Sequence, residues 1–123
     1  MEIYKNYKFH ASRYLTTVPK DHICSKMHGH TFTLTIAIDG PVNKNTDFVM
    51  DFYEIDDIYN RHIHSKLDHH ILNEVDGLES PTTEKLCIWI FNRLKDAFPG
   101  EVELVSISVN EGEDYGCSYY GDQ

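Results

Sequence analysis

The residues best suited to chemistry lie in segment 24–30, which reads Cys-Ser-Lys-Met-His-Gly-His. His28 and His30 stand two residues apart, so in an extended strand both imidazoles project from one face, close enough to share a metal ion. Imidazole pairs are typical zinc ligands, and the thiol of Cys24 could act there as a ligand, a base or a nucleophile. Two surface histidines and a structural cysteine account for the same spacing, so both interpretations stay open on this segment alone.

Three other places in the chain carry groups that could act on a ligand. Asp68 precedes His69, and a carboxylate next to an imidazole can orient it and raise its basicity. Glu111 ends a predicted strand on its apolar face, where it could accept two hydrogen bonds from an amino-pyrimidinone edge. Thr82 and Thr83 lie in the first turn of a predicted helix, where free amides favour an anion or a polar ligand atom. A polar loop for Asp68 and His69, a solvated carboxylate for Glu111 and ordinary helix capping for the two threonines are the alternative explanations.

Length and composition limit the classes of protein that this chain can be. Its 123 residues suffice for one domain, residues 1–123, and its eight histidines raise the expectation of a metal or proton-transfer site. The formal net charge of −9 argues against binding to nucleic acid or an anionic membrane, because phosphates would be repelled. The three cysteines lie far apart, unlike a disulfide framework, and the first residues contain no apolar signal core. We therefore expect a soluble cytoplasmic protein.

Hydrophobic alternation and capping signals predict the elements that must position these groups. In 32–38, apolar side chains take one face and mostly threonines the other, which is typical of a half-buried strand. A short extended stretch at 49–50 precedes a capping-box pattern at 51–54, and Ser-Pro at 80–81 predicts the start of a second helix, which Pro-Gly at 99–100 ends. The predicted order is two strands, two helices and two strands, with the strands at about 2–13, 30–39, 102–110 and 117–120.

This order predicts an α+β domain with two helices on one face of a four-stranded antiparallel sheet. In the third strand, Val105, Ile107 and Val109 are expected to share one face with Glu111. A sheet this small leaves open edges, which natural proteins cover or pair. Oligomerisation by strand pairing is therefore expected.

In order and spacing, these segments resemble the 6-pyruvoyltetrahydropterin synthase and 6-carboxytetrahydropterin synthase family across almost the whole chain. The three-residue gap between Cys24 and His28 is closer to the bacterial carboxy-forming branch than to the animal pyruvoyl-forming branch. The matching pieces are Phe9-His10-Ala11-Ser12, Cys24 with His28-Gly29-His30, Asp51-Phe52, Leu67-Asp68-His69-His70-Ile71-Leu72-Asn73, Gly77-Leu78-Glu79-Ser80-Pro81-Thr82 and Glu111.

The resemblance implies a tunnelling fold, in which three subunits close their sheets into a barrel and two trimers stack into a hexamer with sites between subunits. It implies 7,8-dihydroneopterin triphosphate as the substrate. In the carboxy-forming branch the products would be 6-carboxy-5,6,7,8-tetrahydropterin, acetaldehyde and triphosphate, on the path to queuosine. A lyase that forms 6-pyruvoyltetrahydropterin is the alternative within the same family.

The resemblance also implies a role for each matching site residue. Glu111 would anchor the pterin ring, Cys24 would be the proton-transferring thiol, and Asp68 with His69 would be its partner pair. Zinc at His28 and His30 would bind and acidify the side-chain oxygens of the substrate, as a Lewis acid. Thr82 and Thr83 stay candidates for substrate binding.

One position departs from the family pattern. The family has a third zinc-binding histidine where this chain has Arg13, and a guanidinium keeps its proton and has no lone pair for zinc. By alternation Arg13 shares the face of Phe9 and Ala11 and points toward the site.

Three outcomes follow from Arg13. In the first, His10, His22 or Cys24 completes the zinc site. In the second, zinc binds weakly or is absent, and Arg13 itself supplies positive charge to the substrate. In the third, the chain is a pterin-binding paralogue with altered or lost lyase activity. A small structural metal protein, with Cys24, His28 and His30 as a closed site, is a further alternative.

Overall fold

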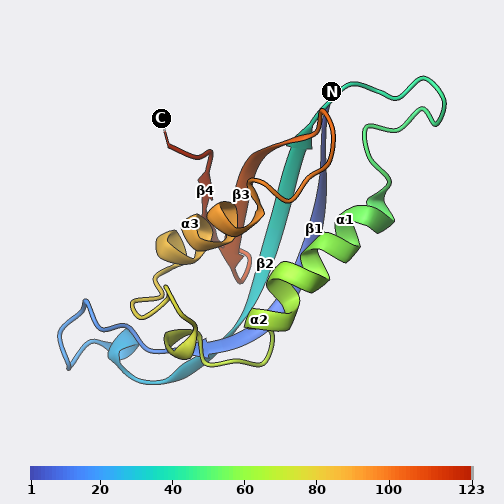
Figure 1. Ribbon diagram of the computed structural model, residues 1–123. Helices are drawn as coiled ribbons and strands as arrows, with labels where there is room; N and C mark the ends of the chain where they lie inside the picture. Colours follow the sequence, from blue (N-terminus) through green and yellow to red (C-terminus); the bar gives the residue numbers. More distant parts are fainter. Residues whose placement is uncertain (123) are drawn as a thin grey trace.

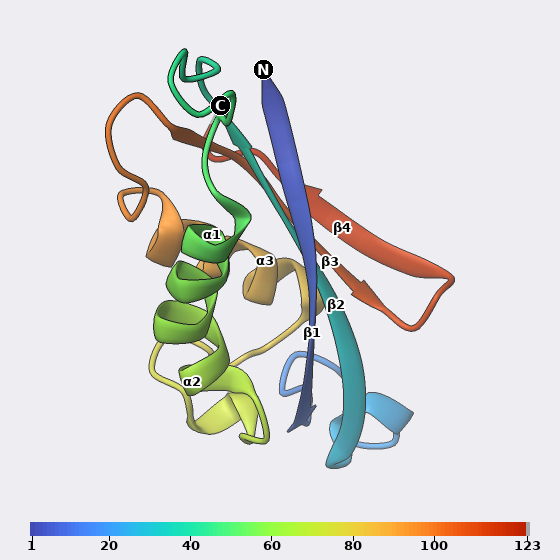
Figure 2. The same ribbon diagram turned by 90° about the vertical axis from the view of Figure 1, so that its right-hand side faces the viewer.

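A computed structural model describes residues 1–122, in which a four-stranded antiparallel sheet carries its helices on one face (Figure 1, Figure 2). The strands lie in sequence order, so each one pairs with the next along the chain. This arrangement confirms the predicted α+β class. The strands are β1 (Glu2–Arg13), β2 (His28–Asp39), β3 (Glu103–Glu111) and β4 (Tyr115–Tyr119), and the α-helices are α1 (Phe52–Tyr59), α2 (Ser65–Leu67) and α3 (Thr83–Leu94).

The core lies between the sheet and the helices, as the alternation in β2 predicts. Phe32, Leu34, Ile36 and Ile38 are each 0% exposed on the face that the helices cover. Phe9 of β1 pairs with Phe32 in register, and their rings stack with centroids 5.2 Å apart. This apolar face fixes the direction of every side chain farther along β1 and β2, because a shift of one residue would turn the whole set outward.

The first helix begins at its predicted cap but continues in an unpredicted form. The Asp51 side chain accepts a hydrogen bond from the backbone N–H of Tyr53 at 2.9 Å and caps α1. After Tyr59 the chain passes through a π-helical turn, Asn60–His64, before α2. Such turns are rare and occur frequently at functional sites.

The second helix begins two residues later than predicted. Thr82, not Ser80, is the N-cap of α3, and its hydroxyl accepts the backbone N–H of Lys85 at 3.1 Å. The Pro81 carbonyl instead accepts a hydrogen bond from Arg13 at 3.1 Å, which holds Pro81 outside the helix. Thr82 therefore caps α3 and Thr83 begins it.

A bulge in β3 corrects part of the predicted alternation. The register passes from Ala37 opposite Ser106 to Ile38 opposite Leu104, so Val105 has no partner in β2. An extra residue shifts the side-chain order of a strand by one position. Val105 therefore leaves the predicted face, whereas Ile107, Val109 and Glu111 are all buried.

Two other boundaries differ from the sequence prediction. The last strand covers Tyr115–Tyr119 rather than 117–120, because a tight turn with Gly112 at φ 63° brings the chain back earlier. Residues 49–50 form a bend and not an extended stretch, although Met50 is buried.

One open edge of the sheet is partly covered by the chain itself. Segment 68–71 runs beside the end of β1: the Asp68 carboxylate accepts the backbone N–H of His10 at 2.9 Å, and the His70 carbonyl accepts that of Ser12 at 3.1 Å. A bridge between Ser12 and Ile71 extends this contact. It places the Asp68–His69 pair against β1.

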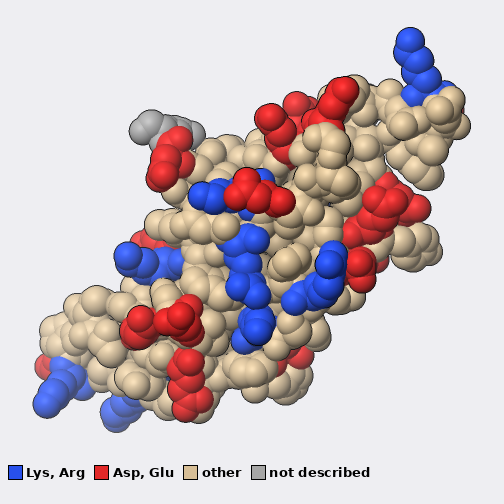
Figure 3. All heavy atoms as spheres, in the orientation of Figure 1, with Lys and Arg blue, Asp and Glu red and all other residues tan. Residues whose placement is uncertain are grey.

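The surface carries charges of both signs. On the face in Figure 3, several basic side chains form a short central column, and acidic side chains lie around it. Within residues 1–122, none of the helices has the length and apolar character needed to cross a membrane.

Candidate active site

A cavity of about 380 Å³, here called the Cys24 cavity, lies where the ends of β1 and β3 meet the start of α3. The thiol comes from a short 3-10 turn, Ile23–Ser25, which is held to the main body by a hydrogen bond from Leu15 N–H to the Cys24 carbonyl at 2.7 Å. Cys24 is half-buried. The side chains that matter for chemistry in its wall are Arg13, Cys24, Thr82, Thr83, Glu111 and Tyr115.

The charged centre of this cavity is a buried ion pair between Arg13 and Glu111. Their side chains are only 5% and 6% exposed, so both charges are almost entirely removed from water. One guanidinium nitrogen of Arg13 also donates to the Pro81 carbonyl at 3.1 Å and to the Thr83 hydroxyl at 3.4 Å. Glu111 is therefore an inward carboxylate, and the solvated alternative left open by its sequence position is wrong.

His28 and His30 share one face of β2, as their spacing predicts. Their rings lie 4.6 Å apart between centroids and nearly perpendicular, at 89°. The Nδ1 atom of His28 lies 2.6 Å from the Lys26 carbonyl, so Nδ1 carries a proton and donates it to that carbonyl. Burial, then Arg13 and His28, lower the pKa of His30, which favours its neutral form at pH 7.

The donor set does not fit a catalytic zinc site with three protein ligands. In the part of the chain that the structure describes, no group of three or more His, Cys, Asp or Glu side chains is arranged to hold a metal ion. Glu111 Oε1 lies 3.9 Å from His30 Nε2 and could complete such a set, but it pairs with Arg13. A fixed guanidinium beside two imidazoles also repels a divalent cation. The site predicted for zinc therefore offers two protein ligands, His28 and His30, and lacks the third.

The predicted acid–base pair, Asp68 and His69, is formed but lies elsewhere in the chain. His69 Nδ1 is 2.7 Å from Asp68 Oδ2. Burial opposes ionisation of Asp68, but the hydrogen bonds from the His10 backbone and His69, with the nearby His64, together lower the pKa of its carboxyl group. His69 itself has φ 59°, a conformation that costs a non-glycine residue energy and often marks a functional site.

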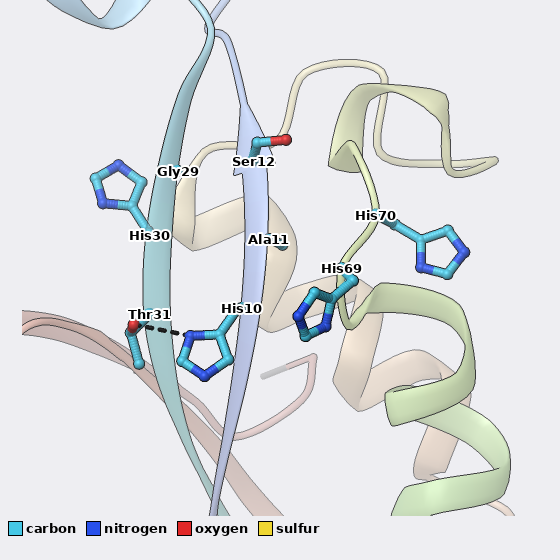
Figure 4. Close-up of a pocket in the computed structure, with 8 residues that line it drawn as sticks. All are labelled: His10, Ala11, Ser12, Gly29, His30, Thr31, His69 and His70. Atoms are coloured by element: carbon cyan, nitrogen blue, oxygen red, sulfur yellow. Dashed lines mark hydrogen bonds between the residues drawn. The ribbon is translucent and has the colours of Figure 1, made fainter.

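His69 lines a second cavity of about 420 Å³, here called the His10 cavity. In Figure 4 the ring of His69 points toward β1, while the ring of His10 projects toward Thr31, and the two ring centroids are 5.9 Å apart. His10 also shares a hydrogen bond of 2.9 Å with the Thr31 hydroxyl. The ring of His30, which lines this cavity too, projects away from both.

The structure thus divides the predicted site residues into two groups. Within one chain, the Cys24 cavity brings together the thiol, the arginine, the two threonines and Glu111, whereas the Asp68–His69 pair belongs to the His10 cavity. His30 links them, since it lines one cavity and stands 3.9 Å from a carboxylate in the other. Convergence of all these groups between neighbouring chains stays a prediction.

Sequence reasoning missed one neighbour of the acid–base pair. His64 Nε2 lies 3.4 Å from Asp68 Oδ2, and His64 Nδ1 lies 3.3 Å from the Tyr59 hydroxyl. His62 and His64 diverge around a helix, so their spacing gives no signal of a paired site. The informative spacing is the four residues between His64 and Asp68, which places them on one side of a helical turn.

Sequence comparisons give relatives with related activities. The sequence model of the family described as 6-pyruvoyl tetrahydropterin synthase matches residues 2–122. The dihydroneopterin monophosphate aldolase of Pyrococcus furiosus is 35% identical over 91 residues, 74% of this chain and 75% of the relative. The 6-carboxy-5,6,7,8-tetrahydropterin synthase of Synechocystis sp. is 34% identical over 113 residues, 89% of this chain and 84% of the relative.

A structural comparison supports the same fold. The 6-pyruvoyl tetrahydropterin synthase of Caenorhabditis elegans superimposes with a TM-score of 0.88 and 19% sequence identity, over 99% of this chain and 96% of that one. The sheet order and the two main helices are therefore common to both proteins.

Proposed function

The chain belongs to the 6-pyruvoyl tetrahydropterin synthase family, and on that premise we propose that it is a lyase that cleaves the side chain of a phosphorylated dihydropterin. In its finer form, the proposal is that 7,8-dihydroneopterin triphosphate and water give 6-carboxy-5,6,7,8-tetrahydropterin, acetaldehyde and triphosphate. The observation that supports it most is the Cys24 cavity, where a thiol and a buried carboxylate share one wall.

Glu111 is the proposed anchor for the ring. The amino-pyrimidinone edge of a pterin presents two parallel N–H donors, and a carboxylate can accept both. Burial of Glu111 strengthens these hydrogen bonds because little water competes for them. Thr82 and Thr83 lie on the same wall, where their hydroxyls can bind polar atoms of the substrate.

Cys24 is the proposed proton-transferring group at the substrate side chain, with Asp68 and His69 as its partner pair. Because the pair lies at the His10 cavity in one chain, it would reach the Cys24 cavity only from a neighbouring copy. We therefore propose the tunnelling-fold assembly, a homo-hexamer of two trimers. β1 and β4 are the outer strands of the sheet, and the outer edge of β4 and the first half of the outer edge of β1 are compatible with strand pairing between copies.

The proposed proton transfers use only groups of the chain itself. Zinc at His28 and His30 stays a prediction, and in a complete site it would act as a Lewis acid on the substrate oxygens. His30 is neutral at pH 7 by the direction of its pKa and could donate its lone pair, but the third ligand is replaced by Arg13.

A second candidate function is retro-aldol cleavage of a dihydroneopterin phosphate. The 35% identity to a dihydroneopterin monophosphate aldolase, over three quarters of that protein, favours it. Breaking the bond between the first two side-chain carbons would leave a hydroxymethyl group on the ring and release a two-carbon aldehyde phosphate. Loss of lyase activity with retained pterin binding is the third outcome.

Product analysis separates these activities. The purified chain would be incubated with 7,8-dihydroneopterin triphosphate, and separately with the monophosphate, with and without added zinc. Acetaldehyde with 6-carboxy-5,6,7,8-tetrahydropterin supports the first proposal, and a 6-hydroxymethyl pterin supports the second. Pterin binding without any product would refute both and leave a binding protein.

The cellular setting follows from the same proposal. The free cysteines Cys24, Cys87 and Cys117 suit a reducing compartment, so we propose a cytoplasmic enzyme. The carboxylated product would be a precursor of queuosine. The pterin-synthase-like domain would comprise residues 1–123, without nucleic-acid or membrane partners.

A further inference from the structure

The Arg13–Glu111 ion pair occupies the carboxylate that is proposed to anchor the ring. A guanidinium and an amino-pyrimidinone edge resemble each other chemically, because each presents N–H donors in one plane to the two oxygens of a carboxylate. Arg13 is therefore an internal mimic of the ligand edge. A pterin that binds Glu111 through both N–H groups has to displace the guanidinium at least in part.

Displacement leaves a buried positive charge that needs another anion. Arg13 is 4% exposed, its Nε atom is buried without a hydrogen-bond partner, and the two oxygens that accept from it besides Glu111 belong to neutral groups. The other carboxylate in the wall of the Cys24 cavity is Glu84, which is exposed and solvated. An uncompensated buried charge is strongly unfavourable.

We propose that Arg13 selects pterins that carry an anionic side chain. The ring edge of the ligand displaces the guanidinium of Arg13 from Glu111. The phosphate of the same ligand then replaces Glu111 as the partner of the guanidinium. A neutral pterin supplies only the first half of this exchange and leaves Arg13 unpaired. The inference rests on the proposed function, and it adds a specificity-determining residue and a reason for phosphorylated substrates.

The proposal is tested by binding, which requires no turnover. Neopterin and neopterin monophosphate share the same ring edge and differ in the anionic group, so the ratio of their dissociation constants isolates its effect. The wild-type chain should bind the monophosphate about tenfold or more tightly than neopterin, the factor that one charge-assisted hydrogen bond supplies. Inorganic phosphate alone should bind weakly, because it cannot release Arg13 from Glu111.

Variants assign the preference to Arg13. In Arg13→Gln the ratio should fall to near one, and neopterin itself should bind at least as tightly as to wild type, because its competitor for Glu111 is gone. The matched control is Arg61→Gln, since Arg61 is an exposed arginine that pairs with Asp57, and it should keep the wild-type ratio. Arg13→Lys keeps a charge without the planar fork and should retain part of the preference.

The outcomes distinguish this inference from the proposed function. If neither the wild-type protein nor any variant binds neopterin or neopterin monophosphate, the proposed function is wrong. If both pterins bind but wild type shows no preference, or Arg13→Gln keeps the preference, only the role of Arg13 is overturned. If Arg13→Gln does not fold, the wild-type ratio and the Arg13→Lys ratio decide.

Discussion

Removing the charge of Glu111 should destabilise the whole domain and not only weaken ligand binding. In Glu111→Gln the shape of the side chain is kept, but the guanidinium of Arg13 loses its ionic partner. Both side chains are about 95% buried, so solvent does not screen the remaining charge. The substitution therefore tests whether the ion pair exists as described.

The expected loss is about 3–5 kcal/mol, the usual range for breaking a buried pair by removing one partner. At about 2.1 cal/mol/K per residue, the unfolding entropy of this 123-residue chain is about 0.26 kcal/mol/K near the melting temperature. The melting temperature should then fall by about 12–19 °C. That loss is a large part of the roughly 6–18 kcal/mol typical of a chain this long.

Thermal unfolding followed by circular dichroism, with urea titration at one temperature, measures this loss. The control is Glu103→Gln, an exposed carboxylate on the same strand, which should change stability by less than about 0.5 kcal/mol. The double variant Arg13→Met with Glu111→Gln should regain much of the loss, since no lone buried charge remains. Glu111→Gln melting like its control, or strict additivity in the double variant, would refute the buried ion pair.

Three further outcomes are expected. Cys24→Ala should abolish turnover while leaving the dissociation constant for neopterin monophosphate within about twofold; full activity would remove its assigned role. Arg13→His should raise the zinc content measured by elemental analysis of the purified protein, and unchanged content would mean that the missing ligand does not limit metal binding. Hydrogen bonds from Lys5 and then Tyr7 lower the pKa of Asp56 below its ordinary 3.8. The ionised Asp56 therefore stabilises the fold above pH 3.8, and this stabilisation is lost as the pH falls through the pKa that Asp56 has in the folded protein. Acid unfolding of Asp56→Asn should accordingly depend less steeply on pH below 3.8 than that of wild type, and equal slopes would contradict the linkage.

The parts of the fold that the sequence predicts are those decided by local pattern. The alternation in β2 and the cap at Asp51 each depend on residues close in the chain, and both are confirmed. The predicted start of α3 is wrong, because Arg13, which is distant along the chain, donates a hydrogen bond to the Pro81 carbonyl. The predicted face of Val105 is wrong for the same kind of reason. The bulge that moves Val105 depends on the register between two strands, which is a property of the pair.

In the candidate site, too, local pattern predicts some features, whereas contacts between distant residues are not predicted. Strand alternation correctly gave the direction of Arg13 and the common face of His28 and His30. The ion pair with Glu111 joins residues 98 positions apart along the chain (111 − 13), and no spacing rule reports such a contact. Within one chain, Cys24 and the Asp68–His69 pair belong to different cavities, and their proposed convergence would require assembly of copies, which no motif in the chain reports.

The segment that runs along β1 has a consequence for how copies of the chain can associate. Backbone groups on one margin of an antiparallel strand alternate between inward and outward, and the outward N–H groups of His10 and Ser12 are already bonded within the chain. Tyr14 is held in the same way by Asn73 at 3.0 Å. The Lys8 carbonyl also accepts the Tyr59 hydroxyl, at 3.4 Å. Among the residues that the structure describes, the stretch of β1 before Lys8 keeps its outward backbone groups available, so a strand contributed by another copy would have to dock on the first half of β1 and stop there.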